Sequence, residues 1–241
     1  MHREAHYWYS ERIRRDMGVV VYGHYGPPMI AFPTTGGDEW EYERQGVIGA
    51  MAHAIEGGRV KVFCVNTNNS DSFGNNAAHP RHRSYMQAMY DQYIAEEVFP
   101  FVRAHCHGHD AGIWTMGASL GGYHAANTLL KHPDAVRACF AMSGVYDMRR
   151  FMDGFYDENF YYNNPLDYVG GMADPGLIES VSSANLHIAT GTGPWEHPAH
   201  SYDLSRALSF KGIRHSLDDW GPLGGHDWPY WKHMMREYLK G

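Results

Sequence analysis

The sequence predicts an α/β protein whose doubly wound, mostly parallel sheet is covered by helices on both faces. Apolar, strand-like runs alternate with segments of helical spacing, which is the pattern of this fold class. The chain has 241 residues and is 44% hydrophobic, which is enough for one sizeable core. The sequence contains no internal repeat, low-complexity tract or linker, so we expect a single domain over residues 1–241.

The expected elements follow one another along the chain. Strands are predicted at 17–22, 29–32, 60–65, 111–116, 136–142, 186–190 and 215–220. Helices are predicted at 46–55, 85–105, 120–131, 199–210 and 228–239. Pro100 is expected to break or kink the second of these helices, because proline lacks a backbone N–H donor. Residues 147–183 are rich in Tyr, Asn and Gly and lack clear periodicity, which predicts a small irregular cap or binding segment.

Composition and charge exclude several classes of protein. The formal net charge is -7 and there is no long basic run, which argues against nucleic acid as a partner. The N-terminus has no apolar signal-peptide core, and no run of about 18 apolar residues could span a membrane. The three cysteines are far apart, and Cys64 and Cys139 lie in strand-like runs where buried free thiols are common. We therefore expect a reduced, cytoplasmic protein.

Histidine is unusually frequent, with 17 residues, and is densest between His105 and Asp110. Imidazole, thiolate and carboxylate groups are zinc ligands, so a metal site is one interpretation of this stretch. However, the stretch lies where a helix is expected to end, and glycine and histidines are ordinary residues at such an end. The sequence therefore favours helix termination over a metal site.

The main chemical signal is the pattern G-x-S-x-G at residues 117–121, centred on Ser119. A predicted strand comes directly before it and a predicted helix directly after it, which is the required context. The nucleophile of such a turn has strained dihedral angles, and the two small flanking residues let strand and helix approach each other. Backbone N–H groups at the helix N-terminus favour developing negative charge. Ser119 is therefore the predicted nucleophile.

A serine needs a general base within hydrogen-bond reach. In this architecture the base follows the nucleophile in the chain, and eight histidines do so. His226 stands out because it lies in a glycine-rich loop between the last predicted strand and the last predicted helix. His124 is expected to pack within the helix after the nucleophile, and His233 to be structural or exposed. We therefore predict His226 as the base.

The acid that orients the base should follow the strand at 186–190. Glu196 is the first carboxylate after that strand and is the preferred candidate. Asp203, within a predicted helix, and Asp147, after the preceding strand, remain alternatives. Asp227 adjoins the histidine, and sequence neighbours seldom orient each other well.

Two backbone N–H groups should stabilise the oxyanion of the transition state. One is expected from Leu120, the residue after the nucleophile. The other should come from the loop after the strand at 29–32, where Thr35 is the candidate and Gly36 lies close behind.

These residues together resemble the α/β-hydrolase family called putative esterases, which includes S-formylglutathione hydrolases, feruloyl esterase domains and mycolyltransferases. The matching pieces span most of the chain in order: FPTTGG at 32–37, GASLGG at 117–122, AMSG at 141–144 and GHDW at 225–228. The resemblance implies an α/β-hydrolase fold, ester hydrolysis or acyl transfer, and no cofactor. It also places the acid at Glu196 and the second oxyanion donor at Thr35.

The sequence thus predicts a serine carboxylic-ester hydrolase that acts on a small or aromatic acyl ester. Aromatic residues crowd 146–168 and flank the proposed acid and base, where they could line a cleft or simply pack onto the core. Other hypotheses are an acyltransferase or thioesterase, and an esterase-like binding protein with weak or lost activity. The expected partner is a small-molecule ester, with no nucleic acid and no membrane, and a homo-oligomer is plausible.

Overall fold

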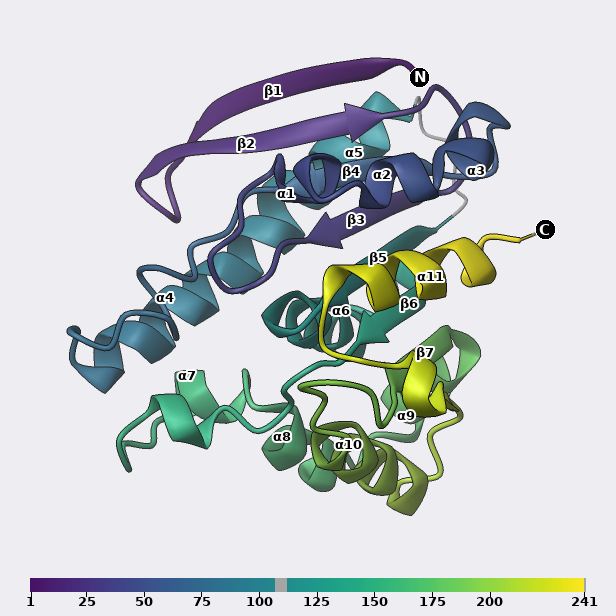
Figure 1. Cartoon of the computed structure of the whole chain (residues 1–241). Helices are drawn as coiled ribbons and strands as arrows, with labels where there is room; N and C mark the ends of the chain where they lie inside the picture. Colours follow the sequence, from purple (N-terminus) through teal and green to yellow (C-terminus); the bar gives the residue numbers. More distant parts are fainter. Residues whose placement is uncertain (107–111, 241) are drawn as a thin grey trace.

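The computed structural model describes residues 1–106 and 112–240 and confirms the predicted fold class (Figure 1). A single sheet has the strand order β1-β2-β4-β3-β5-β6-β7-β8. Strand β2 is antiparallel to both of its neighbours, and every other pair is parallel. The strands are β1 (Arg3–Ser10), β2 (Arg15–Tyr22), β3 (Pro28–Phe32), β4 (Lys61–Val65), β5 (Ile113–Ala118), β6 (Val136–Met142), β7 (Asn185–Thr190) and β8 (Ser216–Asp219).

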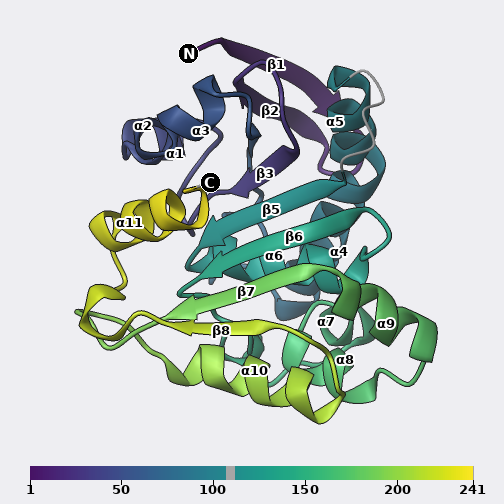
Figure 2. The ribbon, with the colours of Figure 1, turned by 90° about the vertical axis from the view of Figure 1, so that its right-hand side faces the viewer.

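Helices cover both faces of the sheet, as Figure 2 shows. One face carries α1 (Glu41–Arg44), α2 (Val47–Ala50), α3 (Ala52–Glu56) and α11 (Trp228–Tyr238). The other carries α4 (Pro80–Tyr93), η1 (Ile94–Val98), α5 (Phe99–His105), α6 (Leu120–Lys131), α8 (Pro165–Gly171), α9 (Pro175–Ser183) and α10 (Ala199–Phe210). The remaining short helices are η2 (Arg149–Phe151), α7 (Glu158–Tyr161) and η3 (Gly221–Leu223).

The two layers explain why the central strands are apolar throughout. In β3, Met29 and Ala31 face the layer of α1–α3 and α11, whereas Ile30 and Phe32 face the layer of α4–α6. All five residues of this strand are buried. A strand covered on both faces loses the alternation of polar and apolar residues. The cysteines in strands, Cys64 and Cys139, are buried and free, as expected.

The structure differs from the sequence prediction near the N-terminus and at Pro100. Strand β1 was not predicted from the sequence. Its first half contains the charged residues Arg3 and Glu4, which obscure the alternation of exposed and less exposed side chains along the strand. The predicted helix at 85–105 begins earlier, at Pro80, and is not broken at Pro100. A π-helical turn, η1, precedes α5, and Pro100 lies in the first turn of α5. Such a turn shifts the hydrogen-bond pattern by one residue, which accommodates a residue without an N–H.

The segment 147–183 contains the short helices η2, α7, α8 and α9, and it is tied to the start of α4. The buried Arg83 side chain donates to the carbonyl of Phe151 at 2.6 Å and to Asp153 at 2.9 Å. The Ser84 hydroxyl donates to Asp157 at 2.9 Å. These contacts hold the segment against the body of the fold.

The parallel strands bring several loops to one edge of the sheet. The carboxyl ends of β3, β5, β6 and β7 all lie there, and this edge is where ligands of open α/β sheets bind. Within residues 1–106 and 112–240, no helix is long and apolar enough to cross a membrane.

Candidate active site

Ser119 lies on a sharp turn between β5 and α6. Its φ is 56° and its ψ is -123°, a conformation that side-chain-bearing residues rarely adopt. The N–H of Ser119 donates to the carbonyl of Met142 at 2.9 Å, which ties the turn to the end of β6. Strained backbone of this kind is characteristic of functional sites. The structure therefore places Ser119 as the G-x-S-x-G pattern predicts, at the carboxyl edge of the sheet.

The glycines of the pattern permit very close backbone contacts. A Cβ atom on Gly117 would lie 2.1 Å from the carbonyl oxygen of Gly121. A Cβ atom on Gly121 would lie 2.2 Å from the carbonyl oxygen of Phe32. Both distances are too short for any side chain, and both involve backbone atoms that cannot rotate away. The spacing of the motif thus brings the first turn of α6 directly against the end of β3.

His226 and Glu196 lie together, from two loops at the same edge. The Nδ1 atom of His226 is 3.9 Å from Oε2 of Glu196, and their side chains are 28% and 2% exposed. The backbone N–H of His226 donates to the carbonyl of Pro194 at 2.9 Å, which joins the two loops. Across the described chain, Glu196 is the one carboxylate within 4 Å of a ring nitrogen of His226.

The alternative acids have other partners. Asp147 accepts hydrogen bonds from the backbone and side chain of Arg149. Asp203 forms an ion pair with Arg206 on the exposed surface of α10. Asp227 caps the N-terminus of α11 by accepting from Trp228 N–H at 2.7 Å. The geometry therefore favours Glu196 over all three.

Three side chains that the sequence analysis did not single out as site residues hold Glu196 and His226. The Ser143 hydroxyl donates to Oε2 of Glu196 at 2.5 Å, and the Thr190 hydroxyl donates to Oε1 at 3.2 Å. The indole N–H of Trp231 donates to the Ser143 hydroxyl at 3.0 Å, and its ring packs edge-on against His226 at 5.1 Å. Ser143 directly follows β6, and only the pairing of β6 with β5 and β7 brings it to this site, which the sequence does not reveal.

Burial shifts both ionisable groups toward their neutral forms. Burial raises the pKa of Glu196, although hydrogen bonds from Ser143 and other groups oppose the shift. Burial also lowers the pKa of His226, and the nearby His197 adds to this effect. A neutral imidazole at neutral pH is the form that can accept a proton.

The Ser119 hydroxyl and the His226 ring are not hydrogen-bonded to each other in the described part of the chain. The His226 nitrogen that faces Glu196 is Nδ1. The opposite nitrogen, Nε2, is therefore the one left for the serine. Catalytic hydrogen bonds are often long in a free enzyme and tighten when substrate binds.

The peptide between Thr34 and Thr35 has a fixed orientation. The carbonyl of Thr34 accepts from Gly37 N–H at 3.1 Å and from the Asn69 side chain at 3.4 Å. The Thr34 N–H and hydroxyl both donate to the Glu41 carboxylate, at 2.8 and 2.7 Å. Because a trans peptide points its N–H opposite to its C=O, the Thr35 N–H must point away from Gly37 and Asn69. Thr35 is exposed, and within the described residues its N–H donates no hydrogen bond to the protein.

His124 orients Asn69 in this network. Burial lowers the pKa of His124 to about 3, so its ring is neutral at working pH. Nε2 of His124 lies 2.8 Å from Oδ1 of Asn69, which leaves the amide nitrogen of Asn69 to donate to Thr34. The predicted packing of His124 in α6 is confirmed, since the side chain is buried.

Tyr42 joins the end of β3 to the nucleophile strand. Its buried hydroxyl donates to the carbonyl of Phe32 at 2.8 Å and accepts from the N–H of Ala118 at 3.1 Å. The Tyr42 hydroxyl thus links Phe32, which precedes the proposed oxyanion loop, to Ala118, which precedes Ser119.

Replacing Tyr42 with phenylalanine is expected to destabilise the protein by about 1–3 kcal/mol, because a buried N–H and a buried C=O lose their partner. For a chain of this size, Tm falls by about 2–4 °C per kcal/mol. The matched control is Tyr93→Phe, because the Tyr93 hydroxyl is buried without a hydrogen-bond partner within the described residues. Equal Tm values for the two variants in calorimetry would contradict this role of Tyr42.

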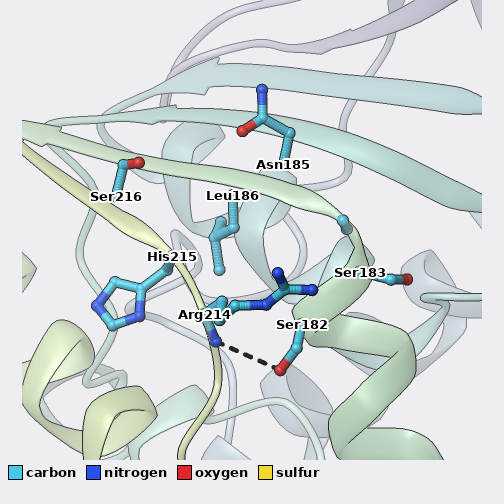
Figure 3. Close-up of a pocket in the computed structure, with 8 residues that line it drawn as sticks. Ser182, Ser183, Asn185, Leu186, Arg214, His215 and Ser216 are labelled. Atoms are coloured by element: carbon cyan, nitrogen blue, oxygen red, sulfur yellow. Dashed lines mark hydrogen bonds between the residues drawn. The ribbon is translucent and has the colours of Figure 1, made fainter.

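A polar hollow of about 300 Å³ lies elsewhere and is not part of this site (Figure 3). It is lined by the start of β7, at Asn185 and Leu186, and by Arg214, His215 and Ser216 before and at the start of β8. Figure 3 also shows the hydrogen bond from Arg214 N–H to the Ser182 hydroxyl, 3.3 Å long. The hollow is therefore at the amino edge of the sheet, opposite Ser119.

An apolar cluster begins one residue from the nucleophile. Leu120 packs with side chains from α6 itself, from the loop before α4 and from 145–160, namely Tyr123, Phe73, Val145, Met148, Met152 and Phe160. Phe151 and Phe155 are only partly buried against this cluster. Several other aromatic residues of the segment, Tyr146, Phe160 and Tyr168, are buried and pack the core.

Comparisons with known proteins agree with the observed fold. A family model described as "Putative esterase" matches residues 10–240. A solved ferulic acid esterase shares 16% identity with a TM-score of 0.75, covering 99% of this chain and 96% of that one. The S-formylglutathione hydrolase of Agrobacterium tumefaciens shares 15% identity with a TM-score of 0.76, covering 99% and 93%. Mycobacterium tuberculosis MPT51 (FbpC1) shares 15% identity with a TM-score of 0.72, covering 98% and 97%. No curated protein sequence matches the chain.

Proposed function

Since the chain belongs to the esterase family matched over residues 10–240, we propose that it hydrolyses carboxylic esters with Ser119 as nucleophile, His226 as general base and Glu196 as the orienting acid. The family match confirms the predicted class of enzyme, a serine esterase. The assignment of residues is carried by one observation: a strained serine at the carboxyl edge of the sheet, where a histidine lies 3.9 Å from a buried carboxylate.

In the proposed mechanism, Oγ of Ser119 attacks the ester carbonyl carbon while its proton passes to Nε2 of His226. The C–O bond to the alcohol then breaks, and His226 returns the proton to the leaving oxygen. Water attacks the resulting acyl-enzyme and gives its proton to His226. Collapse of the second tetrahedral intermediate frees the carboxylic acid and restores the Ser119 hydroxyl. Glu196 holds the imidazole and stabilises its charged form.

The oxyanion in both steps is proposed to accept from the backbone N–H groups of Leu120 and Thr35. Leu120 is the first residue of α6, so its N–H has no partner within the helix. The contact between Gly121 and the Phe32 carbonyl brings the loop that carries Thr35 against this helix end. The hydrogen bonds at Thr34 fix the orientation of the second donor before substrate arrives, which is the condition for effective electrostatic catalysis.

The apolar cluster beside Leu120 supports an ester with a small or aromatic acyl group. Phe151 and Phe155 leave part of their rings uncovered and are proposed to contact that group. The direct test compares kcat/KM for p-nitrophenyl acetate, a p-nitrophenyl ester of a long-chain acid and a feruloyl ester. Highest kcat/KM for the long-chain ester would contradict the proposed acyl group.

The pH dependence of kcat/KM follows from the environment of His226. Its pKa lies below the ordinary value of 6.5, chiefly because of burial, so the neutral base persists to lower pH. We therefore expect the midpoint of the acid limb of kcat/KM to lie below pH 6.5, with the neutral base predominant at pH 7. Initial rates with p-nitrophenyl acetate at constant ionic strength measure this directly. An acid limb centred above pH 7 would show that His226 is not the group that titrates.

A further inference from the structure

A second cluster of ionisable side chains lies between β1 and α5, and it comes from residues that are about a hundred positions apart in the sequence. Glu4 and His6 share the face of β1 that points inward, because strand residues two apart lie on the same side. Figure 2 shows α5 beside the β1–β2 hairpin, and His105 is the last residue of α5. The helix thereby brings His105 against the two strand residues.

One carboxylate oxygen is the centre of this cluster. Oε2 of Glu4 lies 3.1 Å from Nε2 of His6 and 3.2 Å from Nε2 of His105. All three ligand atoms lie within 4.8 Å of one another. A tetrahedral zinc ion with bonds of about 2.1 Å separates its ligands by about 3.4 Å. The two distances from Oε2 of Glu4 to the imidazole nitrogens are close to that value.

The charge of the cluster also suits a cation. In the described residues, the ion-pair partners of Glu4 are three histidines, His2, His6 and His105, and no lysine or arginine. Lys61 is the nearby cation, and it donates to the carbonyl of His105 at 3.4 Å. Two neutral imidazoles and one carboxylate are a common ligand set for zinc.

Aromatic rings support the two histidines. Phe101 packs against His6 with ring centres 5.1 Å apart and against His105 at 5.5 Å. The buried Phe63 packs edge-on against His105, also at 5.5 Å. An apolar surround of this kind limits the movement of the ligands and lowers the local dielectric.

We propose that Glu4, His6 and His105 form a zinc-binding site that clamps the edge strand β1 to α5. The site is independent of ester hydrolysis, because β2, β4 and β3 separate β1 from the nucleophile strand β5. At the usual strand spacing this is about 19 Å. From the sequence, a metal site was conceivable only in the stretch from His105 to Asp110, of which residues 107–110 lie outside the described part of the chain.

Titration of the untagged, full-length protein with Zn²⁺ in a calorimeter tests the proposal. Wild type is expected to bind one ion with Kd on the order of 10 μM or tighter. Saturation should raise Tm by about 5–11 °C at a hundredfold excess over Kd, because binding then adds about 2.7 kcal/mol of stability. Co²⁺ in place of Zn²⁺ should give the visible absorption bands of a low-coordinate site.

The variants Glu4→Gln and His6→Gln should each weaken Zn²⁺ binding by about 100-fold, because each removes one of three ligands. The matched control is His233→Gln, from a helical pair in which His233 lies 3.9 Å from Glu237. That variant should bind as wild type does. Fluorophosphonate labelling of the active serine should stay unchanged in all three, which verifies that they are folded.

Two results would overturn the proposal. One is the absence of Zn²⁺ binding to wild type at millimolar concentration. The other is equal binding by wild type, Glu4→Gln and His6→Gln, which would place the metal on other histidines of the chain.

Discussion

Replacement of Ser119 with alanine is expected to lower kcat/KM for ester hydrolysis by about 10⁴-fold or more. The variant removes the only atom that the mechanism lets form a bond to the substrate. Alanine keeps a Cβ at the strained position, where φ is 56°, so the turn between β5 and α6 is not altered sterically. Steady-state kinetics with p-nitrophenyl acetate measure the loss.

The matched control for this change is Ser183→Ala. Ser183 lines the hollow at the opposite edge of the sheet, and among the described residues its hydroxyl donates only to the carbonyl of Ser180. We expect kcat/KM of this variant to stay within about twofold of wild type, as for surface substitutions away from the site. A Ser119→Ala enzyme that retains more than a tenth of the wild-type kcat/KM would exclude Ser119 as the nucleophile.

Replacement of Glu196 with glutamine is expected to lower kcat by about 10³–10⁴-fold. Glutamine has nearly the same shape, so the hydroxyls of Ser143 and Thr190 can still hold the side chain. What is lost is the negative charge, which fixes the tautomer of His226 and stabilises its protonated form. The measurement is kcat at saturating substrate, together with Tm as a check on folding.

Asp147→Asn is the control that separates the two candidate acids. Asp147 is half-exposed and forms its hydrogen bonds with Arg149. Its replacement is expected to change kcat by less than about threefold. If kcat instead fell steeply in Asp147→Asn and stayed normal in Glu196→Gln, the acid would be Asp147 and the proposed site would need revision.

The sequence was most informative where local geometry dictates residue type. The G-x-S-x-G pattern followed a predicted strand and preceded a predicted helix, and the structure places Ser119 on that turn. Only glycine tolerates the 2.1 and 2.2 Å approaches at 117 and 121, so this local constraint is visible in the residues themselves. The alternation of strand-like and helix-like segments along the sequence also predicted a sheet covered by helices on both faces.

Residues that act through long-range contacts were not predictable in this way. Tyr42, Ser143 and Trp231 hold the site through partners between 53 and 88 positions away along the chain. No periodicity or spacing marks such contacts, since they depend on which strands become neighbours. Strand β1 was missed for a related reason: as an edge strand it has polar residues that resemble a loop.

The activation of Ser119 as a nucleophile by His226 can be measured by labelling with a fluorophosphonate probe, followed by peptide mass mapping. This activation should give covalent label on Ser119 in the wild type, and the label should be lost in a folded His226→Ala variant. Absence of label from the folded wild-type protein, or label on a residue other than Ser119, would contradict it.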